Sequence, residues 1–111
     1  MDDQKIINIR AAQRGVCTKQ IKKVTEMLSN DNIQEPALKS IDAQLREKAT
    51  ILRELDLKIL DNCDSDQISN EISVASDVSE SISLCLYEIE HALQIKSSER
   101  ARVASEQAAS E

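Results

Sequence analysis

The chain has 111 residues, a length typical of one domain, and a formal net charge of −6. Hydrophobic residues make up 41% of it, which excludes a chain that must stay disordered. One glycine and one proline offer too few turns for an all-β fold. With no Phe, no Trp and one Tyr, Ile, Leu and Val must fill the core. Aliphatic side chains of this kind pack well between helices, as in coiled coils, so the composition predicts an all-α protein.

The first predicted helix covers residues 4–28. Its apolar residues at spacings of four, three and four are Cys17, Ile21, Val24 and Leu28. This spacing is helical. The basic residues, which form a candidate contact surface and occur with no acid between them, are Lys5, Arg10, Arg14, Lys19, Lys22 and Lys23. They form either a solvated face or a contact, within or between chains, with residues 61–90, which hold eight acids and no Lys or Arg.

The second and third predicted helices, 36–61 and 65–96, carry matching heptad patterns. Pro36 suits the first turn of a helix, and Asp64 followed by Gln67 resembles a capping box. We call the apolar residues at alternating spacings of three and four the heptad seam. It comprises Leu38, Ile41, Leu45, Leu52, Leu55 and Ile59 in the second helix, and Ile68, Ile72, Ile82, Leu86 and Ile89 in the third.

An antiparallel fold about the short break between these helices aligns the two halves of the seam. It sets Leu45 against Ile82 and Leu55 against Ile72. The polar members Lys48 and Ser79 then fall opposite each other. This polar seam layer either fixes the register of the helices, or Lys48 merely extends its amine to water.

The predicted fold is therefore an antiparallel, coiled-coil-like helical hairpin with a basic N-terminal helix, in a three-helix arrangement. We expect one domain over residues 1–96. Residues 97–111 are rich in Ala, Ser and Glu, and we expect this tail either to fray or to extend the third helix.

Residues that commonly build catalytic or metal sites are scarce. His91 has no Cys or Asp at ligand spacing, and one glycine rules out a Gly-rich phosphate loop. Cys17, Cys63 and Cys85 give neither a disulfide framework nor zinc-ligand spacing. We therefore expect a non-enzymatic protein with no catalytic residues, no metal and no cofactor.

The expected location is intracellular and cytoplasmic. The first ten residues, MDDQKIINIR, contain no long apolar run of the kind found in signal peptides. No stretch approaches the roughly 18 apolar residues that would span a bilayer. Cys17 and Cys85 lie on apolar stripes, as buried thiols do in a reducing compartment.

Several short strings follow one another in a distinctive order. A basic helix contains RAAQRGVCTK (10–19), and a Leu-rich helix contains LREKATILRELD (45–56). ILD (59–61), an acidic turn and an acidic helix with Glu71-Ile72 and Glu88-Ile89-Glu90 come next. This order resembles the N-terminal helical region of Gag-like polyproteins from Pao/BEL retrotransposons, over roughly three-quarters of the chain.

The resemblance implies a helical segment that precedes a capsid-forming region and has an interaction or assembly role. It carries over no catalytic residue. The chain contains no capsid region, no Cys-His zinc knuckle and no aspartic protease motif, so particle assembly is not implied.

The leading functional hypothesis is a protein–protein interaction or self-association module, with other helices or a homo-oligomer as partner. A second hypothesis is a nucleic-acid-binding accessory domain whose basic first helix contacts phosphate. Net acidity and the lack of aromatic platforms for base stacking oppose it. A third is a generic intracellular coiled-coil adaptor. Membrane binding by the first helix is disfavoured because that helix has no Trp or Phe anchor.

Overall fold

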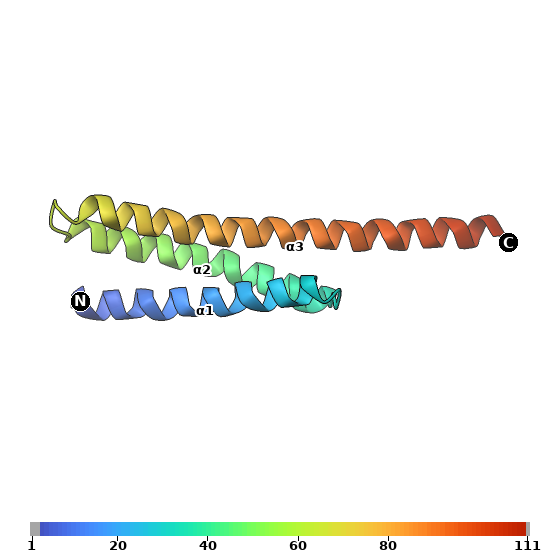
Figure 1. Ribbon diagram of the computed structural model, residues 1–111, viewed down its shortest axis with the longest axis horizontal. Coiled ribbons are helices and arrows are strands. Elements are labelled where there is room, and N and C mark those ends of the chain that lie inside the picture. The colour runs from blue at the N-terminus through green and yellow to red at the C-terminus, as the bar shows by residue number, and fades with distance from the viewer. Residues whose placement is uncertain (1–2, 111) are drawn as a thin grey trace.

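The computed structural model describes residues 3–110, which form three helices joined by short turns. These are α1 (Asp3–Ser29), α2 (Glu35–Asp61) and α3 (Ile68–Ser110). Consecutive helices run antiparallel, so α1 and α3 point the same way (Figure 1). No strand occurs in the described part of the chain. The prediction of an all-α, three-helix arrangement is confirmed.

The turn between α1 and α2 closes the end of α1 with backbone hydrogen bonds. Asp31 has a φ of 51°, in the left-handed region that Asn and Asp tolerate better than most residues. The N–H of Asn32 donates to the carbonyl of Met27 at 3.1 Å, and that of Asp31 donates to Leu28 at 3.4 Å. This is the Schellman pattern, which satisfies the last carbonyls of a helix. The chain then reverses into Pro36 at the start of α2.

Helix boundaries differ from the sequence expectation mainly at α3. Residues 65–67 form a turn, and α3 begins at Ile68 instead of residue 65. The N–H of Gln67 donates to the backbone carbonyl of Asp64 at 2.8 Å, so a backbone bond, and not a side-chain capping box, joins these residues. At its other end α3 continues through Ser110, so the tail extends the helix. Residues 1, 2 and 111 lie outside the described residues.

The core lies between all three helices and contains no aromatic residue. It is formed by Cys17 and Val24 of α1, Leu38, Ile41, Leu45 and Leu52 of α2, and Ile82, Cys85, Ile89 and Ala92 of α3. The apolar face of α2 therefore serves both neighbours.

The heptad seam predicted between α2 and α3 is wrong near the turn that joins them, because α2 packs against α1 as well as α3. Leu45 and Ile82 are both buried in the core, but Ile72 is 50% exposed and Ile68 is also exposed. Leu55 and Ile59 are only half-buried, and so is Leu86 further along α3. A two-helix seam faces one partner, whereas here the core shifts toward the third helix.

The two members of the predicted polar layer differ in burial, since Lys48 is half-buried and Ser79 is exposed. Burial raises the pKa of the Cys17 thiol, and the nearby ammonium of Lys48 opposes that rise. Lys48 is therefore close to α1. Ser79 is exposed and lines a groove between α2 and α3.

Helix α3 is much longer than its neighbours, with 43 residues against 27 in each of α1 and α2. It projects past the turn that joins α1 and α2 (Figure 1), which makes the molecule a rod of 70 × 21 × 20 Å. Residues 97–108 are exposed on every side. Their helix-forming Ala, Glu and Arg residues favour helix without a packing partner.

Candidate interaction surfaces

Arg10 joins all three helices through two carboxylates. Its Nη1 donates to Oε2 of Glu71 on α3 at 2.7 Å and to Oδ1 of Asp56 on α2 at 3.1 Å. A second bond runs from Nη2 to Oε1 of Glu71 at 3.3 Å, and Arg14 Nη2 donates to Asp56 at 3.2 Å. We call these four residues the Arg10 cluster. The planar guanidinium of Arg10 suits such paired contacts with carboxylates.

The ion pairs of the Arg10 cluster are largely shielded from water. The Arg10 side chain is 9% exposed, and those of Asp56 and Glu71 are 24% and 25% exposed. The hydrogen bond from Arg10 lowers the pKa of Glu71, and the same bond raises the pKa of Arg10. The basic first segment thus contacts the acidic third segment within the chain, as one sequence interpretation proposed.

This cluster divides the predicted basic surface. Arg10 and Arg14 are engaged with carboxylates, whereas the four lysines are exposed along α1. These are Lys5, Lys19, Lys22 and Lys23. They span 19 residues of helix, and the 18 steps from Lys5 to Lys23 cover about 27 Å at 1.5 Å per residue. The structure therefore leaves a sparse lysine row where the sequence suggested a continuous basic surface.

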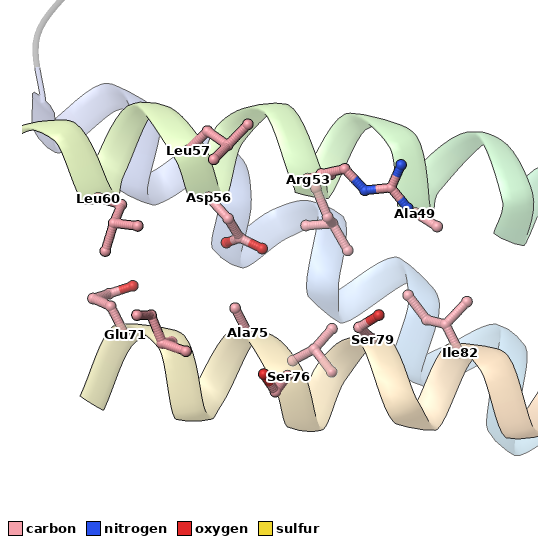
Figure 2. Close-up of a pocket in the computed structure, with 13 residues that line it drawn as sticks. Ala49, Arg53, Asp56, Leu57, Leu60, Glu71, Ala75, Ser76, Ser79 and Ile82 are labelled. Carbon is pink, nitrogen blue, oxygen red and sulfur yellow. The ribbon is translucent and has the colours of Figure 1, made fainter. Parts of the chain in front are cut away.

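A groove with a volume of about 270 Å³ lies between α2 and α3, close to the turn that joins them. Figure 2 shows α1 behind these two helices, so the groove opens on the face away from α1. Its lining residues are Ala49, Leu52, Arg53, Asp56, Leu57 and Leu60 of α2, and Glu71, Ile72, Ala75, Ser76, Val78, Ser79 and Ile82 of α3.

Small side chains produce this groove. Ala49 on α2 lies across the groove from Ser79 on α3, and Ala75 lies further along α3, across from Asp56 (Figure 2); larger aliphatic residues at these positions would fill the space. Leu57 and Ile72 line the same groove and are 59% and 50% exposed, which is unusual for large apolar side chains. An open apolar groove between two helices is a shape that accepts the apolar face of another helix.

One basic residue, Arg53, lines the α2 side of the groove. Lys39 and Arg46 recur at intervals of seven residues on the same side of α2, but they line a separate hollow together with Asp42 and Glu90. Arg46 pairs with Asp42 of its own helix at 2.7 Å. Arg53 forms no ion pair with any described residue, so its charge is free to interact with a partner.

A second apolar surface lies on α3 and was not found from the sequence. Leu84, Tyr87, His91 and Ile95 follow one another at spacings of three, four and four, so they share one face of the helix. We call them the outer stripe. Leu84 is 57% exposed and Tyr87 is 69% exposed, and the ring of His91 stacks parallel to that of Tyr87 with centroids 6.4 Å apart.

The outer stripe is bordered by acidic side chains. Asp77, Glu80 and Glu88 are exposed, and none of them forms an ion pair within the described part of the chain. This charge is opposite to that of Arg53 beside the groove.

Reactive groups do not gather at either surface. Burial raises the pKa of the Cys85 thiol to about 11, so this cysteine is held as a neutral core residue. Within residues 3–110, no group of three or more His, Cys, Asp or Glu side chains is arranged to hold a metal ion. No helix over the same residues is apolar and long enough to cross a membrane.

Comparisons with protein-family models, with curated proteins and with solved structures found no match to this chain. The resemblance to Gag-like helical regions therefore rests on the helix order, the charge order and the short strings given above.

Proposed function

We propose that this chain is a non-enzymatic protein–protein interaction module that works by self-association through the groove between α2 and α3. One observation carries the proposal: the groove is apolar, open to solvent and walled by two helices. A third helix packed there would bury the exposed parts of Leu57 and Ile72, and burial of apolar area is the main favourable term in association.

The distribution of apolar residues around α3 supports association. Ile82 and Ile89 face the core, Ile72 lines the groove, and Leu84 and Tyr87 lie on the outer stripe. A helix with apolar residues on several sides is typical of one that is covered on several sides. In this three-helix structure only the core side is covered.

The resemblance to the helical region of Gag-like polyproteins agrees with this proposal, because it implies an interaction or assembly role. A coiled-coil adaptor would use the same groove for a helix of a different protein. Nucleic-acid binding is less well supported, since Arg10 and Arg14 are occupied by Asp56 and Glu71.

The test is the mass of the purified chain in solution. Light scattering and sedimentation equilibrium, from low to high micromolar concentration, should give a mass that rises above the monomer value of 12.4 kDa. A groove variant that combines Arg53→Glu with Ser79→Glu should remain closer to the monomer. Both positions are exposed, so the fold should be retained, as circular dichroism would verify.

A control variant carries the same change in charge on α1. It combines Ala12→Glu with Lys19→Glu, also at exposed positions, and should associate like the unmodified chain. A mass of 12.4 kDa at every concentration of the unmodified chain would overturn the proposal.

A further inference from the structure

We infer that the groove of one copy receives the outer stripe of a second copy, so that self-association joins two different surfaces. The inference rests on the proposed function and names what occupies the groove. It follows from the shape of the two surfaces, from their charges, and from the like-charge contacts that other pairings would create.

The shapes are complementary. The groove is concave because Ala49, Ala75 and Ser79 are small, whereas the stripe presents Leu84 and Tyr87 from the convex surface of a single helix. Tyr87 is the only Phe, Tyr or Trp residue in the chain, and it projects into solvent. Tyrosine is among the residues that most often anchor protein interfaces, because its ring buries a large area and its hydroxyl can still reach water.

The charges are complementary as well. The groove is edged by Arg53, which has no ion-pair partner among the described residues, and the stripe is edged by Asp77, Glu80 and Glu88. Docking the stripe in the groove brings basic and acidic side chains together. Charge pairs of this kind at the rim of an interface mainly steer the partners and select the correct pairing.

Symmetric pairings of either surface are disfavoured by the same charges. Groove against groove would bring the Arg53 side chains of two copies together. Stripe against stripe would bring together two sets of acids that include Glu80 and Glu88. Like charges facing each other across an interface oppose wrong pairings. The pairing of stripe with groove is the one that avoids both repulsions.

Such a contact leaves one groove and one stripe unoccupied at the two ends of every open assembly. A contact between two different surfaces adds further copies until the assembly closes into a ring, or it continues as a filament. The mass of the unmodified chain should therefore increase with concentration, to a closed assembly or to a filament.

The test uses two variants that each lose one surface. The groove variant, Arg53→Glu with Ser79→Glu, retains its stripe. A stripe variant, Leu84→Gln with Tyr87→Gln, retains its groove and adds no charge, and Gln favours helix. Each variant alone should associate at least about tenfold more weakly than the unmodified chain, the scale of losing an interface anchor.

The decisive measurement is an equimolar mixture of the two variants. The stripe of the groove variant can enter the groove of the stripe variant, but neither chain can then accept another copy. The mixture should therefore form a one-to-one dimer that grows no further, as light scattering and native mass spectrometry would show.

Other outcomes separate the inference from the proposed function. A stripe variant that associates normally would indicate groove-to-groove packing and overturn the inference alone. Loss of association in the control variant Ala12→Glu with Lys19→Glu would place the stripe on the lysine row of α1, and would also overturn it. Variants that are monomeric both alone and when mixed would do the same. A monomeric unmodified chain would overturn the proposed function itself.

Discussion

Replacing Arg10 with Met removes the guanidinium that joins α1 to α2 and α3 while keeping a long, helix-compatible side chain. Asp56 retains Arg14, but Glu71 loses both of its hydrogen bonds from Arg10. Breaking a fully buried pair costs about 3–5 kcal/mol, and an exposed pair contributes about 0–1 kcal/mol. Since the two carboxylates keep about a quarter of their exposure, we expect a loss of roughly 2 kcal/mol.

The measurement is urea denaturation followed by helical circular dichroism, at a concentration where light scattering shows a constant mass. The midpoint should fall while the dependence on urea stays the same, because the surface exposed on unfolding hardly changes. Arg100→Met is the matched control. It breaks the pair in which Arg100 Nη1 lies 2.5 Å from Oε1 of Glu35, but the Arg100 side chain is 63% exposed, so we expect no measurable change.

Two results would refute this reasoning. A loss below about 0.5 kcal/mol would mean that the Arg10 pairs contribute no more than exposed ones do. A gain in stability would mean that the cost of removing Arg10, Asp56 and Glu71 from water exceeds their mutual attraction, as happens at some buried ion pairs.

Three further predictions follow from burial and charge. Because the pKa of Glu71 is lowered, its contribution to stability is present above the ordinary pKa of Glu, near 4.5, and is lost as pH falls below that value. The urea midpoint of the unmodified chain should therefore fall as the solution is acidified, and it should fall less steeply with pH in the Arg10→Met variant. Leu45→Ala should cost about 2–5 kcal/mol in denaturation, since Leu45 is fully buried, against less than about 0.5 kcal/mol for the exposed Leu57→Ala. Lys48→Leu should stabilise by up to about 1 kcal/mol, because a half-buried apolar side chain would replace an amine beside α1, and should leave the mass in solution unchanged.

Helix positions were predictable because local signals agree with one another. Pro36, the polar stretch after Ser29 and the break after Asp61 all lie where the apolar periodicity stops. The predicted bounds of the first two helices differ from the observed ones by one residue or none at each end. The predicted start of α3, at residue 65, was too early. The sequence suggested that the Asp64 side chain caps the helix, whereas in the structure the Asp64 backbone carbonyl accepts a hydrogen bond within a turn.

The direction in which each helix faces was harder to predict. The heptad pattern places Ile72 in a seam, and a two-helix coiled coil would bury it there. A third helix draws the core toward its own side, which leaves Ile72 at the groove. The individual partners of Arg10 were not predicted, because Asp56 and Glu71 lie 46 and 61 residues away in the sequence.

The outer stripe did leave a signal in the sequence. Leu84, Tyr87 and Ile95 are large apolar residues that fall between the seam positions Ile82, Leu86 and Ile89 or beyond them, and helical spacing puts them on one face. The stronger periodicity of the heptad seam makes these residues look like scattered surface positions. They stand out as a separate face only once the core side and the groove side of α3 are known.

The Arg10 cluster and the groove occupy the same end of the molecule, and this has a consequence for association. Asp56 and Glu71 line the groove (Figure 2), and Arg10 of α1 forms ion pairs with both carboxylates. Without Arg10, Asp56 would keep Arg14 but Glu71 would have no ion-pair partner, and its uncompensated carboxylate at the groove would repel an acid-edged stripe. Arg10 pairs with both carboxylates from α1, so that Arg53 carries the unpaired charge at the open edge of the groove. The same residue that fastens α1 to the hairpin therefore also makes the groove electrostatically suitable for the stripe of a second copy.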